Sequence, residues 1–292
     1  MQMSKKSVFF VILAGILWGT SGIFVNAWQI YNLSSMQITA IRTIVAFPCF
    51  LIYVLLFNRK ALRINLRDFP LYLCSGITLF STAAFYYSSM QQTSISTAVI
   101  LMYTAPALVL GWSVAFFGEK LTVKKAFAVL FIIIGCALVS GVVGGLRFNA
   151  VGILYGLLSG LSYGAYNILT KLQMRRKCNP ISATLYGFFF AFILSFVTCD
   201  ISEIFPVFVN NFASASLLAV FHGILTFVLP YFLYTLSLKE LPAGVASSMA
   251  VFEPLSATVF SIVLFSEKLS VFSVSGIVLI LGAVLVLSRS DG

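Results

Sequence analysis

Charged side chains are scarce in this chain. Only 9% of its 292 residues are Asp, Glu, Lys or Arg and 60% are hydrophobic, whereas an average soluble domain has roughly 25% charged residues. This composition excludes a water-soluble globular protein. Apolar stretches of about 17–25 residues are needed to cross the hydrocarbon core of a bilayer. Ten such stretches can be marked in the sequence, at 7–27, 36–57, 69–90, 95–117, 123–142, 150–171, 180–198, 214–238, 243–265 and 271–288. We therefore predict an all-α polytopic membrane protein with ten transmembrane helices.

The groups that enzymes use for catalysis are scarce as well. There is one histidine, there are 8 acidic residues, and the 5 cysteines show neither metal-site spacing nor a disulfide framework. The sequence has no glycine-rich nucleotide-binding loop, so ATP is not expected to drive the protein directly. We predict that the chain is not an enzyme and carries no metal or cofactor. An intramembrane enzyme or a structural scaffold is the less favoured alternative.

The formal net charge of +10 is explained by membrane topology. With the N-terminus inside, the outer side receives only Arg147 and Lys268, and fifteen basic residues fall on the cytoplasmic side. This asymmetry is typical of the positive-inside rule. We therefore predict a multi-pass protein of the plasma (cytoplasmic) membrane, with both termini cytoplasmic, surrounded by the lipid bilayer and without a nucleic-acid partner. The fifteen are Lys5, Lys6, Arg59, Lys60, Arg63, Arg67, Lys120, Lys124, Lys125, Lys171, Arg175, Arg176, Lys177, Lys239 and Arg289.

The two halves of the sequence resemble each other. A shift of 148 residues aligns Glu119-Lys120-Leu121 with Glu267-Lys268-Leu269, and a shift of 145 aligns Gly15 with Gly160. Five spans per half is an odd number, so the second half must enter the membrane upside down relative to the first. Two inverted apolar repeats are typical of secondary transporters that alternate access. We predict one five-helix repeat over 1–145 and a second, inverted one over 146–292.

Three ionisable residues inside the predicted spans, Arg42, His222 and Glu253, are candidates for coupling or gating. Glu253 lies about 15 Å into its span, near the midplane, where a charge costs at least roughly 2.5–3.5 kcal/mol. It is either a proton carrier or a structural acid paired across a helix interface. Arg42 either holds a substrate carboxylate or pairs with Glu253. His222 is either a polar core residue or a protonatable partner of Glu253.

Polar aromatic residues also fall deep inside the spans, although tyrosine usually gathers at the membrane interfaces. In 150–171, a polar stripe begins at Tyr163 with the i, i+3, i+4 spacing of one helix face, and it either lines a cavity or bonds neighbouring helices. Prolines inside spans free backbone carbonyls and are candidates for hinges or cavity backbone. The predicted substrate-binding set is Trp18, Tyr86, Tyr103, Tyr163, Tyr166, Asn167 and Tyr234. The predicted hinge set is Pro106, Pro230 and Pro254.

Several short motifs occur in a specific order along the two halves. They are Ile16-Leu17-Trp18-Gly19, Arg42, Pro106 followed by Gly118-Glu119-Lys120-Leu121, and Glu253-Pro254 followed by Ser266-Glu267-Lys268-Leu269. This arrangement covers essentially the whole chain and resembles the ten-helix EamA-type exporters of the drug/metabolite transporter superfamily. The resemblance implies two inverted five-helix repeats around a central cavity and export of amino acids or related metabolites. Small four-helix multidrug transporters of that superfamily carry an essential glutamate in helix one. The first span here has no acid, so proton coupling through that position is not implied.

The functional prediction is a secondary active transporter that exports small metabolites such as amino acids by alternating access. Its partners are a small-molecule substrate and, as the candidate coupling ion, a proton. The alternative is a multidrug or lipophilic-cation exporter, whose aromatic cavity would need an exposed acid such as Glu253.

Overall fold

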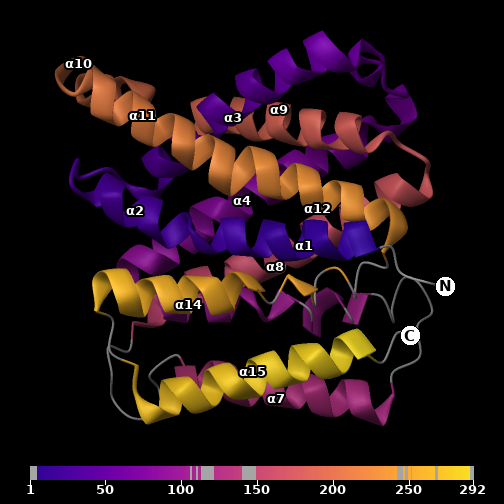
Figure 1. Cartoon of the computed structure of the whole chain (residues 1–292), viewed down its shortest axis with the longest axis vertical. Helices are drawn as coiled ribbons and strands as arrows, with labels where there is room; N and C mark the ends of the chain where they lie inside the picture. Colours follow the sequence, from indigo (N-terminus) through magenta and orange to yellow (C-terminus); the bar gives the residue numbers. More distant parts are fainter. Residues whose placement is uncertain are drawn as a thin grey trace.

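Every regular element that the computed structural model describes is a helix (Figure 1). The structure describes residues 5–105, 107–109, 111–112, 122–139, 149–241, 246, 249–250, 252–266 and 269–289. Five of the described segments are long and apolar enough to cross a membrane: Lys5–Gln29, Ser35–Phe57, Leu66–Gln92, Pro180–Thr198 and Phe212–Glu240. The protein is therefore an all-helical, multi-pass membrane protein.

The described helices are α1 (Lys5–Gly19), α2 (Ser21–Gln29), α3 (Ser35–Phe57), α4 (Phe69–Gln92), α5 (Ile95–Met102), α7 (Val123–Val139), α8 (Ala150–Arg175), α9 (Pro180–Thr198), α10 (Phe205–Asn210), α11 (Phe212–Gly223), α12 (Leu229–Glu240), α14 (Phe252–Phe265) and α15 (Val271–Arg289). Short 3-10 helices η1 (Arg59–Leu62), η2 (Leu66–Asp68) and η3 (Ile201–Glu203) lie in connections. The element η4 (Ile224–Val228) is a π-helix that joins α11 to α12. The first described turn of α1 and the last of α15 lie at the same end of the bundle (Figure 1).

Capping side chains mark several helix starts. The hydroxyl of Ser34 accepts from the backbone N–H of Gln37, and the Gln37 side chain accepts from the Ser34 N–H, which makes a capping box before α3. The side chains of Asn149 and Asn179 cap α8 and α9, and Pro180 occupies the first turn of α9. These side chains satisfy backbone donors that the first turn of a helix leaves without partners. The predicted starts of the corresponding spans are thus fixed by local chemistry.

Two of the predicted spans are interrupted. Residues 7–27 fall in α1 and α2, which are separated at Thr20, whose hydroxyl donates to the Leu17 carbonyl oxygen at 2.7 Å. Residues 214–238 fall in α11, η4 and α12, and Pro230 lies in the first turn of α12. The predicted spans 95–117 and 243–265 are described in part, by α5 and α14, and Pro106 lies outside the described residues.

Contacts between helices come in pairs that are related by exchanging the two halves of the chain. Helix α1 packs against α12 and α14, and its counterpart α8 packs against α4 and α5, which belong to the spans equivalent to those of α12 and α14. Three further pairs join segments of equivalent spans: α3 with α9, α5 with α14, and α7 with α15. The last of these pairs lies at one edge of the bundle (Figure 1). Equivalent segments of the two halves therefore make similar contacts.

Equivalent glycines allow close helix approaches in both halves. A Cβ at Gly15 would lie 3.2 Å from the Ala250 carbonyl oxygen, and a Cβ at Gly160 would lie 2.9 Å from that of Met102. Each of these carbonyls precedes a proline by four residues and so cannot accept the regular helical hydrogen bond. The Tyr103 hydroxyl donates to the Ala250 carbonyl instead. Helices α1 and α8 thus each approach the backbone that precedes a proline of another span. Among the described residues, a tyrosine hydroxyl binds the freed carbonyl only at Ala250.

Candidate functional site

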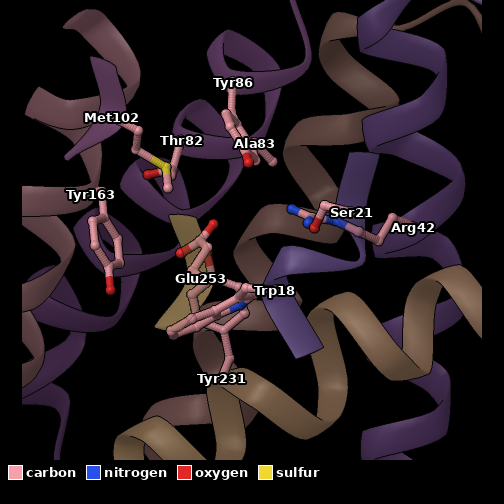
Figure 2. Close-up of a pocket in the computed structure, with 10 residues that line it drawn as sticks. All are labelled: Trp18, Ser21, Arg42, Thr82, Ala83, Tyr86, Met102, Tyr163, Tyr231 and Glu253. Carbon is pink, nitrogen blue, oxygen red and sulfur yellow. The ribbon is translucent and has the colours of Figure 1, made fainter. Parts of the chain in front are cut away.

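A small cavity lies between helices from both halves of the chain. Its volume, counted as the space that the centres of water-sized spheres can occupy, is about 20 Å³, which is room for roughly one water molecule and no organic solute. Figure 2 shows the lining side chains pointing toward one another from α1, α2, α3, α4, α5, α8, α12 and α14. They are Trp18, Ser21, Arg42, Thr82, Ala83, Tyr86, Met102, Tyr163, Tyr231 and Glu253.

Arg42 projects into this cavity from α3 and is only 3% exposed. Its Nη1 donates to the Tyr87 hydroxyl at 2.8 Å. The guanidinium carbon lies 5.1 Å from the centre of the Tyr87 ring and 4.3 Å from that of Phe227, so the cation is stacked against aromatic rings, which attract it. The other two nitrogens, Nε and Nη2, have no hydrogen-bond partner in the part of the chain that the structure describes.

His222 supports Arg42 through Tyr87. The ring is fully buried; its Nδ1 accepts from Trp28 Nε1 at 3.2 Å, and its Nε2 lies 3.0 Å from the Tyr87 hydroxyl. The indole nitrogen can only donate, so Nδ1 carries no proton and the ring is the neutral tautomer with its proton on Nε2. His222 and Arg42 then both donate to the Tyr87 hydroxyl oxygen. The bonded partners of His222 are thus Trp28 and Tyr87, and Glu253 is not among them.

Glu253 reaches the cavity from the first turn of α14 and is 3% exposed. A carboxylate is favourably placed near a helix N-terminus because the helix dipole is positive there. The Tyr103 hydroxyl, whose proton goes to the Ala250 carbonyl, lies 3.4 Å from a carboxyl oxygen of Glu253. None of the three guanidinium nitrogens of Arg42 is bonded to Glu253, since one donates to Tyr87 and the other two have no partner. Arg42 and Glu253 therefore form no direct pair, which was one of the two alternatives for Arg42, although both residues face the same cavity (Figure 2).

Aromatic rings form the wall opposite Arg42. Trp18 packs against Tyr231 and Tyr234 with ring centres 4.9 and 5.3 Å apart, and against Tyr163 at 6.1 Å. Within the described residues, seven buried side-chain polar atoms have no hydrogen-bond partner, and five of them belong to residues that line the cavity. Buried polar atoms normally have partners. Their concentration here makes the cavity a candidate binding site for a polar ligand.

The predicted substrate-binding residues separate into two groups. Trp18, Tyr86 and Tyr163 line the cavity, and Tyr103 touches Glu253 beside it. Tyr166, Asn167 and Tyr234 do not line it, because their polar groups join helices. The Tyr166 hydroxyl lies 3.4 Å from Thr235 Oγ1, and Asn167 accepts from the Tyr234 hydroxyl at 2.7 Å and donates to the Tyr163 carbonyl at 3.0 Å.

Several lining residues were not in the predicted set. Ser21 follows Trp18 by three positions, and Thr82 precedes Tyr86 by four, so both share a helix face with a predicted residue. This spacing would have found them. Ala83 and Met102 are ordinary apolar residues, and Tyr231 resembles any other tyrosine of a span, so the sequence carries no signal for them.

Two of the three predicted hinge positions, Pro230 and Pro254, lie in helices that line the site. Pro230 is buried just after the π-helix η4, and Pro254 is buried next to Glu253. A π-turn inside a longer helix changes which side chains face one side, and such turns often occur at functional sites. Here it carries Phe227 to the guanidinium of Arg42 and is followed by Tyr231 at the cavity. Among the described residues, no three His, Cys, Asp or Glu side chains gather as metal ligands would.

A multi-pass helical bundle that buries a polar cavity between its two halves has the architecture of a membrane transporter. The chain belongs to the EamA-like transporter family, which matches it twice, over residues 5–141 and 150–289. An uncharacterised transporter of Archaeoglobus fulgidus is 28% identical, over 96% of this chain and 95% of that protein. The uncharacterised transporter YxxF of Bacillus subtilis is 25% identical, over 100% and 92%. One solved crystal structure with 18% identity covers 98% of both chains with a TM-score of 0.68 and so shares the fold.

Proposed function

We propose that this protein is a secondary active transporter of the plasma (cytoplasmic) membrane that exports small metabolites such as amino acids by alternating access. In this proposal its ten spans form two inverted five-helix repeats, 1–145 and 146–292, around the cavity, with both termini in the cytoplasm. The asymmetry of the basic residues supports the orientation. The paired helix contacts support the repeat.

The small cavity with its buried polar groups carries this proposal. It holds no more than about one water molecule, yet it gathers the free nitrogens of Arg42, the carboxylate of Glu253 and three further unpartnered polar groups. A ligand that met these groups would need the surrounding helices to separate. We interpret the described conformation as a closed state between openings to the two sides.

The packing suggests how the two openings are related. The contact of α1 with α14 has its counterpart in that of α8 with α5. Movements that open the cavity on one side can therefore be repeated by the equivalent helices on the other, as expected for inverted repeats. Pro230 and Pro254, next to interrupted backbone, are the described candidate hinges.

A lipophilic-cation exporter is the second candidate function. Trp18 stands in contact with three tyrosine rings, and aromatic faces attract cations. Glu253 supplies a carboxylate that has no ion pair with Arg42. Both features suit an organic cation, whereas the free nitrogens of Arg42 do not.

Counterflow in proteoliposomes tests both candidates. Vesicles are loaded with one unlabelled compound and the uptake of its labelled form is measured, with amino acids in one series and tetraphenylphosphonium in the other. Counterflow of amino acids supports the first candidate, and counterflow of tetraphenylphosphonium alone supports the second. Tyr163→Phe removes a cavity hydroxyl and should raise KM, whereas Tyr53→Phe, at an exposed position of α3, should leave it unchanged. If neither series exceeds protein-free vesicles, both candidates fail.

A further inference from the structure

Only one edge of the Arg42 guanidinium remains open. Nη1 is held by Tyr87, and the rings of Tyr87 and Phe227 lie close to the guanidinium carbon. The two nitrogens without partners, Nε and Nη2, form the same side of the guanidinium group, and their N–H bonds run parallel. This is the fork to which a planar carboxylate binds with both oxygens.

A buried cation with two free donors needs an acceptor. Arg42 is 3% exposed inside a membrane protein, where an unpaired charge is costly. Glu253 shares the cavity but does not occupy the fork. A group that brings a single negative charge and two coplanar oxygens would complete it. A dianion such as phosphate would add a second negative charge close to Glu253 and is disfavoured.

We propose that the Nε–Nη2 edge of Arg42 is a carboxylate-binding subsite of the cavity and that Tyr87, His222 and Trp28 are positioning residues for it. The inference rests on the proposed transport function and names the chemical class of its substrate: compounds that carry one free carboxylate. Figure 2 shows the nitrogens of Arg42 pointing toward the side of the cavity where Glu253 lies, so the proposed subsite faces the cavity.

The positioning residues act through a continuous chain of hydrogen bonds. Trp28 donates to His222, and His222 and Arg42 both donate to the oxygen of Tyr87. The chain ties Nη1 to α4 and, through His222, to α11. Because Nη1 is engaged, the guanidinium cannot rotate to present another edge, and the fork stays directed at the cavity. A rotated guanidinium could not donate from both Nε and Nη2 to the two oxygens of a carboxylate. A neutral amide, which has only one such oxygen, cannot accept both bonds.

Matched pairs of compounds test the subsite without any mutation. The purified full-length protein in nanodiscs is titrated with L-leucine against L-leucinamide and L-phenylalanine against L-phenylalaninamide, and its melting temperature is measured. A ligand that binds the folded state raises this temperature. The acids should bind at least about tenfold more tightly than the amides, because a charge-assisted hydrogen bond is lost in each amide. Equal binding of acid and amide, or no shift with either acid, overturns the subsite.

Variants separate positioning from folding. Arg42→Lys keeps the charge but lacks the fork, so the preference for acid over amide should fall to the part that the charge alone supplies. Tyr87→Phe and His222→Gln should reduce this preference without weakening amide binding, which a merely structural role would not do. Arg59→Lys, at an exposed arginine, should keep the full preference. If Arg42→Lys does not fold, the other two variants still decide the matter, and unchanged preference in both overturns the positioning role.

Transport is measured separately on the same preparation. Acids that raise the melting temperature should also show counterflow in proteoliposomes. Acid binding without counterflow would leave the subsite standing and refute the transport function. Counterflow of tetraphenylphosphonium with no acid binding would leave the transport function standing and refute the carboxylate subsite.

Discussion

Replacing Glu253 with Gln tests whether this residue couples transport to protons. The side chain is 3% exposed, has a carboxyl oxygen 3.4 Å from the Tyr103 hydroxyl, and has no ion pair with Arg42. An ionised carboxylate in this position costs at least roughly 2.5–3.5 kcal/mol. If Glu253 is neutral in the closed state, Glu253→Gln keeps its shape and hydrogen bonding, and the free energy of unfolding should change by less than about 1 kcal/mol. If it is ionised and balances Arg42, removing its charge should destabilise the protein by about 3–5 kcal/mol.

Transport gives the decisive measurement for Glu253. A gradient of one pH unit stores about 1.4 kcal/mol per proton, enough for an about tenfold accumulation of a substrate that exchanges with one proton. In proteoliposomes, Glu253→Gln should still catalyse substrate exchange but should accumulate no substrate in response to the pH gradient. Glu203→Gln, at an acid that accepts from Gln37 outside the cavity, is the matched control and should accumulate substrate like the unaltered protein. A stable Glu253→Gln variant with unchanged accumulation would remove this residue from the coupling mechanism.

Three further predictions concern topology, packing and access. Cysteines introduced at Ser266 and at Gly118, which lies outside the described residues, should react with impermeant thiol reagents from opposite sides; reaction from one side would refute the inverted repeat. A Cβ at Gly19 would lie 3.0 Å from the backbone nitrogen of Ala257, so Gly19→Ala should lower the free energy of unfolding by about 1–3 kcal/mol in a denaturant titration. Gly282→Ala, with open space around it, is the control and should leave this free energy unchanged. A cysteine at the cavity residue Thr82 should react with small polar thiol reagents during turnover and be protected by substrate, and equal reactivity at Gly282 would argue against a water-accessible cavity.

The sequence could predict the broad class because that class depends on one-dimensional properties. The length and continuity of apolar stretches decide whether a segment enters a bilayer. A repeated pattern can be recognised by aligning the sequence with itself, without knowledge of the fold. The family was recognised from motifs in a fixed order, and the match over residues 5–141 and 150–289 confirms it. The interruption at Thr20 was not predicted, because a break inside an apolar stretch changes its composition very little. Pro230 predicted a freed carbonyl in its span but not the π-helix η4 that precedes it.

Side-chain direction within the site was decided by tertiary structure. Tyr163 and Tyr166 share one predicted polar stripe, yet the first lines the cavity and the second meets Thr235 on another helix. A periodic pattern identifies a face of a helix but not which neighbour covers each part of it. The cavity also has a volume of only about 20 Å³, which no sequence pattern expresses.

The sequence by itself determined that this protein has a buried arginine, a buried glutamate and a single histidine among its apolar spans. It left open whether Arg42 pairs with Glu253, because opposite charges in one membrane protein are expected to meet. Only the tertiary structure decided otherwise: Tyr87 takes Nη1, Trp28 fixes the neutral tautomer of His222, and the free edge of Arg42 is left toward the cavity. Partners of this kind lie 45 and 194 residues apart along the chain, so their hydrogen bonds depend on how the helices pack and not on any local pattern.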